Sequence, residues 1–151
     1  MPSFRNERRV RHRSDQMFDL VADVERYPEF VPLCTGLRVR SRRPDAHGRE
    51  TLLAEMSVGY KMIRERFTSR VLLDKPRLRV VVEYIDGPFS HLENIWTFRD
   101  EPEPGRSLVT FFIDYEFRSR TLGVLMGTMF DAAFRKFAEA FEQRADTIYG
   151  G

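Results

Sequence analysis

The sequence predicts an α+β domain in which a curved antiparallel sheet of seven strands closes around one long C-terminal helix. Six segments between residues 36 and 118 alternate apolar and polar side chains and are separated by short turns, which is typical of an antiparallel meander. Residues 120–149 then carry apolar side chains every three to four positions, which indicates a helix about 45 Å long. At 151 residues the chain is sized for one domain, 1–151, with one core.

The N-terminal part supplies the first strand and two short helices. Residues 3–12 are predicted as a strand, and Ser14 is a favourable N-cap for the helix that follows. That helix is predicted to end at Tyr27, because a residue before proline is disfavoured in the helical region. Pro28 then opens a second short helix, and Pro32 closes it.

The six remaining strands are predicted at 36–43, 49–59, 63–73, 78–85, 89–99 and 107–118. The last strand is the most regular, with apolar residues at the odd positions from 109 to 117, so one face is expected to be buried and the other wet. A sheet curved in this way cannot fill its concave face with a single helix about 10 Å wide. Either large side chains or a ligand must occupy the remaining space in such a helix-grip arrangement.

The residues expected on the concave face and on the inner side of the long helix form the predicted ligand cavity. Its members are Glu65, Phe67, Val82, Tyr84, Asn94, Trp96, Phe98, Phe111, Ile113, Tyr115, Phe117, Met126, Phe130 and Phe134. Such an aromatic stripe is more often solid core than pocket. Gly123 and Gly127 either hollow out the first turns of the helix or allow it to pack closely against a strand, and the sequence leaves both open.

Two predicted cavity residues are polar. Glu65 alternates with Phe67, so a buried carboxyl there could act as an acid or base, pair with an arginine, or donate to a ligand carbonyl. Asn94 would need a hydrogen-bond partner. Binding is favoured over catalysis, because the sequence has no zinc-protease, nucleophile-elbow, P-loop or Rossmann motif. No catalytic set, metal site or resident cofactor is predicted, and the single cysteine, Cys34, argues against a cysteine-rich zinc site.

The two ends of the meander differ in composition. The turns at 43–49, 74–77 and 100–106 are highly charged, whereas 59–62, 86–89 and the start of the long helix are apolar. The apolar residues predicted to form a cavity mouth are Tyr60, Met62, Ile63, Phe89, Leu122 and Leu125. Turn residues usually face water, so these side chains either meet a membrane surface transiently or pack on one another as a lid.

Charge is unevenly distributed around a net charge of +2. Residues 1–79 carry 18 Lys/Arg against 11 Asp/Glu, and residues 80–151 carry 7 against 12. Arg38, Arg40 and Arg42 share one parity and are predicted to form a basic strand face, which either is simply solvated or meets phosphates of lipid headgroups or RNA. DNA is not an expected partner. With no apolar run long enough to span a bilayer and no secretory signal, we expect a cytoplasmic protein that associates peripherally with membranes.

The segment from Val21 to Cys34, VADVERYPEFVPLC, resembles the hallmark segment of the coenzyme Q-binding proteins. These proteins belong to the START-like, polyketide cyclase/dehydrase superfamily. Further matches extend over nearly the whole chain and comprise RFTSRV at 66–71, GPF at 87–89 with Leu92, WTF at 96–98, residues 109–119 and AFEQRA at 140–145.

The resemblance implies a seven-stranded helix-grip (START/Bet v 1-like) fold that binds a polyprenylated quinone such as ubiquinone, in support of respiratory electron transport at the membrane. It also leaves a second function open, because the family includes a bacterial ribosome association toxin that blocks the joining of ribosomal subunits; the large subunit would then be the partner. A cyclase or aromatase that uses Glu65 is a third alternative. Mitochondrial members carry a targeting sequence before this domain, so a bacterial origin is expected.

Overall fold

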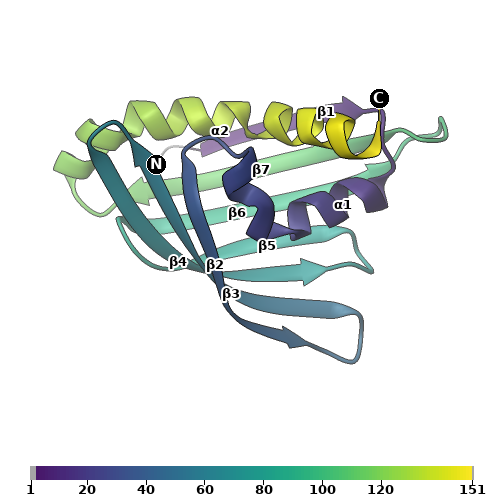
Figure 1. The fold of residues 1–151 in the computed structure, drawn as a ribbon, viewed down its shortest axis with the longest axis horizontal. Helices are drawn as coiled ribbons and strands as arrows, with labels where there is room; N and C mark the ends of the chain where they lie inside the picture. Colours follow the sequence, from purple (N-terminus) through teal and green to yellow (C-terminus); the bar gives the residue numbers. More distant parts are fainter. Residues whose placement is uncertain (1–2, 151) are drawn as a thin grey trace.

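One curved sheet wraps around the C-terminal helix, which confirms the predicted helix-grip arrangement (Figure 1). The structure is a computed structural model and describes residues 3–150. All neighbouring strands are antiparallel, and their order is β1-β7-β6-β5-β4-β3-β2, so the first strand pairs with the last. The elements are β1 Ser3–Val10, α1 Ser14–Ala22, η1 Val24–Glu29 (a 3₁₀ helix), β2 Cys34–Pro44, β3 Arg49–Tyr60, β4 Ile63–Asp74, β5 Arg79–Asp86, β6 Phe89–Asp100, β7 Ser107–Phe117 and α2 Arg120–Tyr149.

The two N-terminal helices differ in detail from the prediction. Ser14 is the first residue of α1 rather than its N-cap, and its backbone N–H donates to Asp100 Oδ1 at 2.9 Å. The helix ends at Ala22, because Asp23 leaves the helical region with φ −84° and ψ 65°. Pro28 lies inside η1 instead of opening it. A tight 3₁₀ turn tolerates this proline because few hydrogen bonds depend on any one N–H.

The C-terminal half of α2 packs on the concave face of β6 and β7 through a cluster of aromatic rings. Trp96 of β6 lies with its ring centroid 4.7 Å from Phe111 of β7 and 4.9 Å from Phe141 of α2. Phe111 and Phe141 are almost completely buried. The apolar side chains that alternate along the strands and those spaced every three to four residues along the helix face each other here. The two sequence patterns therefore predict which faces are buried against one another.

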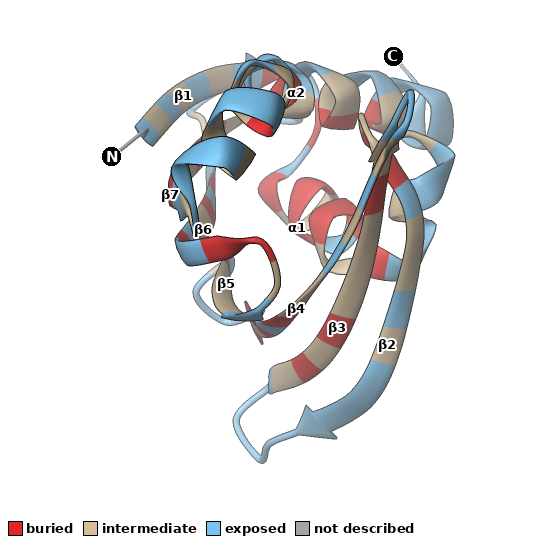
Figure 2. Ribbon diagram, turned by 90° about the vertical axis from the view of Figure 1, so that its left-hand side faces the viewer, coloured by how far each residue is buried: buried red, intermediate tan, exposed pale blue. Residues whose placement is uncertain are grey.

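The two ends of the meander lie at opposite ends of the molecule, as the alternation of turns requires (Figure 1). The β3–β4 and β5–β6 turns gather with the start of α2 at one end, on the left of Figure 1. The charged β2–β3, β4–β5 and β6–β7 turns lie at the other end, together with α1 and the end of α2. Figure 2 views the molecule from the first end and shows the exposed first turns of α2 above the curved sheet. Within the described residues, no helix is long and apolar enough to cross a membrane.

Candidate functional site

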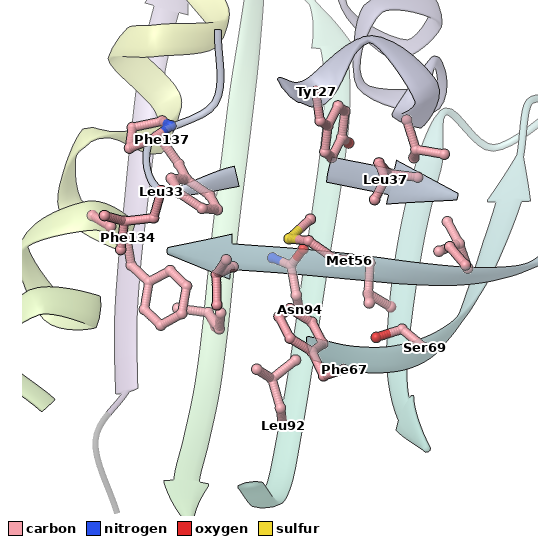
Figure 3. A pocket seen from close by; sticks show the side chains of 18 of the residues that line it. Tyr27, Leu33, Leu37, Met56, Phe67, Ser69, Leu92, Asn94, Phe134 and Phe137 are labelled. Atoms are coloured by element: carbon pink, nitrogen blue, oxygen red, sulfur yellow. The ribbon is translucent and has the colours of Figure 1, made fainter. Parts of the chain in front are cut away.

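An apolar cavity lies between the concave face of the sheet and α2 (Figure 3). Its volume is about 80 Å³. Strands β3 to β7 form one wall, five side chains of α2 form the opposite wall, and η1 with the following loop closes the side next to β2. The lining residues are Val24, Tyr27, Pro32, Leu33, Leu37, Ala54, Met56, Val58, Phe67, Ser69, Val71, Val82, Leu92, Asn94, Trp96, Ile113, Phe130, Ala133, Phe134, Phe137 and Phe141.

Half of the side chains predicted to line a cavity do line it. These seven are Phe67, Val82, Asn94, Trp96, Ile113, Phe130 and Phe134. Four others lie in the core outside the cavity wall, namely Phe98, Phe111, Tyr115 and Met126, all of them buried. Tyr84 and Phe117 instead pack around the ring of Phe89, and the Tyr84 hydroxyl accepts a hydrogen bond from the Phe89 backbone N–H at 3.1 Å. The alternation of apolar and polar residues assigned these side chains to the correct face of the sheet. It could not distinguish side chains that border the cavity from those packed in the solid core.

The prediction that Glu65 lines the cavity is wrong. Glu65 pairs in register with Val58, so its side chain is on the concave face as the alternation indicated. It is nevertheless only half-buried and is not part of the cavity wall. The reason is its position near the β3–β4 turn, where the end of the concave face is accessible to solvent. A carboxyl in this position is not held inside a closed apolar chamber, as an acid or base of a cyclase would need to be.

The sequence analysis did not identify the side of the cavity that is formed by η1, the loop after it, β2 and β3. Tyr27 and Leu33 come from η1 and the loop after it, while Leu37 and Met56 come from β2 and β3. The alternation of Ala54, Met56 and Val58 could have identified the β3 contribution. Tyr27 and Leu33 have no such local signal, because only the folded chain brings their segment over the sheet.

Three polar side chains interrupt the apolar wall. The Tyr27 hydroxyl donates to the backbone oxygen of Val21 at 2.5 Å, and burial raises the pKa of this phenol well above its usual range. Asn94 Nδ2 donates to the backbone oxygen of Phe112 at 2.9 Å. The Ser69 hydroxyl is buried and has no hydrogen-bond partner within residues 3–150. The described lining residues therefore carry no formal charge at neutral pH, and their polarity is confined to neutral hydroxyl and amide groups.

Exposed apolar side chains form a patch in two separate parts at this end of the molecule, one on the β3–β4 turn and one on the start of α2, which Figure 2 shows on opposite sides of the concave face. Met62 is 95% exposed, Val124 76%, Leu125 61% and Tyr60 46%. Ile63 and Leu122 are half-buried at the base of this patch. The assignment of Phe89 to the rim is wrong: it is 3% exposed, because five aromatic rings surround it from β4, β5, β7 and α2. Val124 also belongs to the patch, at the apolar start of the long helix.

Gly123 and Gly127 lie next to open space. A Cβ added at Gly127 would meet nothing within 4 Å, and one at Gly123 would meet only the ring of Phe117 at 3.9 Å. Close packing against a strand therefore does not explain either glycine. Both remain helix-weakening residues in the first three turns of α2.

The three arginines predicted to share one basic strand face do not share it. A register shift between Val39 and Ser41 places an extra residue, Arg40, in β2, and a bulge of this kind inverts the alternation that follows it. Arg38 lies opposite Glu55 on the convex side, whereas Arg42 lies opposite the buried Leu52. Accordingly Arg42 pairs with Glu25 of η1, on the concave side.

The convex face of β3 and β4 adds other arginines instead. Ladder register places Arg64, Arg66 and Arg70 on the same side of the sheet as Arg38, opposite Gly59, Ser57 and Leu53 of β3. All four are exposed, and Glu55 lies between Arg40 and Arg66, at 2.6 Å and 3.6 Å respectively. On β5 to β7 the same convex side carries Glu83, Glu93, Asp114 and Glu116. The convex side is therefore basic over β2 to β4, whereas the acidic side chains of β5 to β7 are mixed with Arg79 and Arg99, and the neighbouring β1 adds Arg5 and Arg9.

A curved antiparallel sheet that grips a long helix around a neutral, apolar cavity defines the class of START-like domains. The chain belongs to the family described as polyketide cyclase / dehydrase and lipid transport, whose match covers residues 10–142. Within residues 3–150 no group of three His, Cys, Asp or Glu side chains is placed to hold a metal ion.

Two relatives point to different functions within this family. The chain is 30% identical over 151 residues to the ribosome association toxin RatA of Rickettsia prowazekii, which covers 98% of this chain and 99% of the toxin. It is 33% identical over 139 residues to the mitochondrial coenzyme Q-binding protein COQ10 homolog B of Xenopus laevis, which covers 90% of this chain and 54% of that protein.

Solved structures agree with the fold. The solution structure of the 18 kDa protein CC1736 from Caulobacter crescentus is 36% identical over the full length of both chains, with a TM-score of 0.78. A START superfamily protein from Mycobacterium smegmatis matches 97% of this chain and 98% of its own with a TM-score of 0.79, at 17% identity. The second likeness concerns the fold alone.

Proposed function

We propose that this protein binds a polyprenylated quinone, ubiquinone or a similar isoprenoid lipid, in its internal cavity and delivers it at the membrane surface for respiratory electron transport. The observation that carries this proposal is the cavity itself. Its wall is formed almost entirely by aliphatic and aromatic side chains, with three neutral polar groups, which is the composition of a site that holds an apolar ligand by burial and orients it by a few hydrogen bonds. The coenzyme Q-binding relative supports the choice of quinone.

The volume of the cavity implies that binding requires opening. At about 80 Å³ it is smaller than a cavity of roughly 150 Å³ that is known to hold benzene, and pockets for drug-sized ligands usually reach about 300 Å³ or more. Phe130, Phe134 and Phe137 of α2 project into this space and would have to move aside. The first turns of α2 are the natural moving part, because two glycines weaken them and little packs on their outer side.

The exposed patch supports a membrane surface as the place of exchange. Met62, Val124 and Leu125 project from the same end of the molecule, and each apolar side chain contributes about 1.5–3 kcal/mol when fully buried. Exposed Lys61 and Arg64 next to the β3–β4 turn, and Arg118 and Arg120 next to the start of α2, would favour anionic headgroups. Such a surface supports reversible docking rather than permanent anchoring.

Uptake of quinone is the direct test. Purified protein incubated with ubiquinone carrying a short tail should elute with bound quinone, and mass spectrometry of an organic extract from freshly purified protein should detect an isoprenoid lipid. The enlarged side chain in Ala133→Trp, on the α2 wall of the cavity, should reduce uptake by filling the space. An extract without isoprenoid lipid, combined with failure to take up added ubiquinone, would reject the proposal.

Docking is tested separately with vesicles that contain an anionic lipid. The Met62→Asp/Leu125→Asp double variant should lose co-sedimentation, because a charge at each position opposes insertion. Ile148→Asp is the matched control: Ile148 is an exposed apolar residue of the same helix, 50% exposed, but at the opposite end of the molecule. Equal binding by all three proteins would show that the patch does not meet lipid.

A second candidate function is association with the large ribosomal subunit. The observation that favours it is the basic convex side of β2 to β4, where exposed Arg38, Arg64, Arg66 and Arg70 could meet RNA phosphates. Sedimentation of a cell lysate at low magnesium tests it: co-migration with the large subunit, lost in Arg66→Glu/Arg70→Glu, would support it. Arg99→Glu, on β6 and outside the basic strands β2 to β4, is the control. Absence of the protein from ribosomal fractions would remove this candidate.

A further inference from the structure

One polar side chain of the cavity wall lacks the hydrogen bond that a buried position normally requires. Of the three polar residues in the wall, Tyr27 and Asn94 each donate to a backbone oxygen. Ser69 of β4 is 5% exposed, and its Oγ has no hydrogen-bond partner within residues 3–150. Its side chain points into the cavity (Figure 3). A molecule bound in the cavity is therefore the partner that the fold leaves open to Ser69.

A serine at this position lowers the stability of the folded protein. A buried hydroxyl without a partner loses its hydrogen bonds to water and gains none in exchange, so such groups are normally paired. The fold does not require a polar residue here, because Phe67 and Val71, the neighbours of Ser69 on the same strand face, are apolar and line the same cavity. A local violation of this kind is typical of a functional site.

The side chains next to Ser69 on the adjacent strands do not engage its hydroxyl. On β3 its partner in register is Ala54, a small residue that also lines the cavity. On β5 its partner is Tyr84, which is not part of the cavity wall and whose hydroxyl accepts a hydrogen bond from the Phe89 N–H. Two small side chains on adjacent strands therefore border the cavity at this point, and Ser69 supplies the polar atom there.

From these observations we infer that Ser69 anchors the head group of the ligand, through a hydrogen bond between its hydroxyl and an oxygen atom of that head group. The inference rests on the binding function proposed above and narrows it to ligands that carry an oxygen. A serine hydroxyl can donate or accept, so a ring carbonyl, a ring hydroxyl and a methoxy oxygen all fit. A hydrocarbon of the same shape would leave the hydroxyl unpaired.

The test compares two probes on the full-length protein: a ubiquinone with a short saturated tail, and a benzene ring that carries the same tail and no oxygen. The ratio of the two dissociation constants is compared between variants, which removes the difference in hydrophobicity between the probes. In Ser69→Ala the affinity for the quinone should fall by about two- to ten-fold, the contribution of one hydrogen bond, while the affinity for the hydrocarbon should not fall. Ser69→Thr keeps the hydroxyl on a side chain that suits a strand, and should retain most of the native ratio.

The stability of the ligand-free protein gives a second readout. Because Ser69→Ala removes an unpaired buried hydroxyl, the ligand-free variant should melt about 2–4 °C higher than the native protein. Added quinone should then raise its melting temperature by less than it raises that of the native protein. A serine with a purely structural role would behave differently, because its loss would lower the melting temperature and leave the affinity for the quinone unchanged.

The chain offers a matched control in Ser107. This residue is also buried with an unpaired hydroxyl, but it is not part of the cavity wall. Ser107→Ala should therefore leave the ratio of the two dissociation constants at its native value. A change in that ratio equal to the change in Ser69→Ala would show that removal of any buried hydroxyl alters binding, and would overturn the specific role of Ser69.

The outcomes separate this inference from the function on which it rests. Native protein that binds neither probe contradicts the proposed function itself. Native protein that binds the quinone, together with a Ser69→Ala variant of unchanged ratio, overturns the role of Ser69 while the binding function stands. Equal loss of affinity for both probes in Ser69→Ala, or failure of that variant to fold, would likewise contradict the inference, since either result would make Ser69 a structural residue.

Discussion

The two halves of α2 differ in how they are held. Residues 131–149 contact β1, the β1–α1 connection and α1 through specific partners. Glu142 pairs with Arg8, Asp146 binds the buried His12 at 2.7 Å, and the Tyr149 hydroxyl donates to the backbone oxygen of Gln16. Residues 120–130 have an N-cap, in which Ser119 accepts from the Leu122 N–H at 3.1 Å, and two buried side chains, Met126 and Phe130. One helix thus combines a fixed segment and a weakly held one.

This difference explains how a single helix can serve both the fold and the proposed exchange of ligand. The fixed half keeps the sheet closed at the charged end, where α1 also packs. The weakly held half lies over the apolar end, next to the exposed patch, so local opening there would expose the cavity without unfolding the core. Loss of a side chain is therefore expected to destabilise the fold more in the fixed half than in the weakly held half.

The largest expected effect is loss of an aromatic side chain from the fixed half. Phe141 is 1% exposed and contacts Trp96, Tyr27 and Phe30 at centroid distances of 4.9, 5.3 and 4.9 Å. Phe141→Ala should lower the free energy of unfolding by about 3–5 kcal/mol, measured by urea denaturation. Leu125→Ala in the other half should change it by less than about 0.5 kcal/mol. Similar losses for the two variants would contradict the division of the helix.

A smaller effect is expected from the polar contacts of the fixed half. Asp146→Ala removes the partner of His12, which is 3% exposed, and should cost about 1–2 kcal/mol in thermal or urea unfolding. Asp131→Ala is the matched control, because its ion pair with Arg135 on the helix surface contributes about 0.5 kcal/mol or less. Equal stability of the two variants would mean that water replaces Asp146 at no cost.

The fold could be predicted because its signals are local. The alternation in residues 109–117 and the helical spacing from Leu122 to Phe141 each specify one element and its buried face. The cavity was only half predictable, since Phe98 and Trp96 share a strand face and only three-dimensional packing decides that Trp96 borders open space while Phe98 does not. Glu65 shows the same limit, because parity gives the face of a residue but not its depth.

The basic face shows why alternation fails at a bulge. Nothing in the run from Arg38 to Arg42 marks Arg40 as the extra residue, yet this one insertion moves Arg42 to the side of η1. The charge division between the two halves of the chain was a better guide. It separates the basic convex side of β2 to β4 from the acidic side chains of β5 to β7, because consecutive strands of a meander are neighbours in space, but it does not place β1, which pairs with β7.

The smallest effect on stability, with a separate effect on rate, is expected in the weakly held half. Gly127→Ala places a methyl group in open space and should raise the free energy of unfolding by about 0.5–1 kcal/mol through better helix propensity. If the first turns of α2 must open for the ligand, the same variant should take up quinone more slowly in stopped-flow experiments while its affinity changes little. Gly87→Ala is the contrasting case: φ there is +146°, and a Cβ would lie 2.5 Å from the Cβ of Phe67, so that variant should be destabilised. Faster or unchanged uptake by a stabilised Gly127→Ala protein would show that the ligand enters by another route.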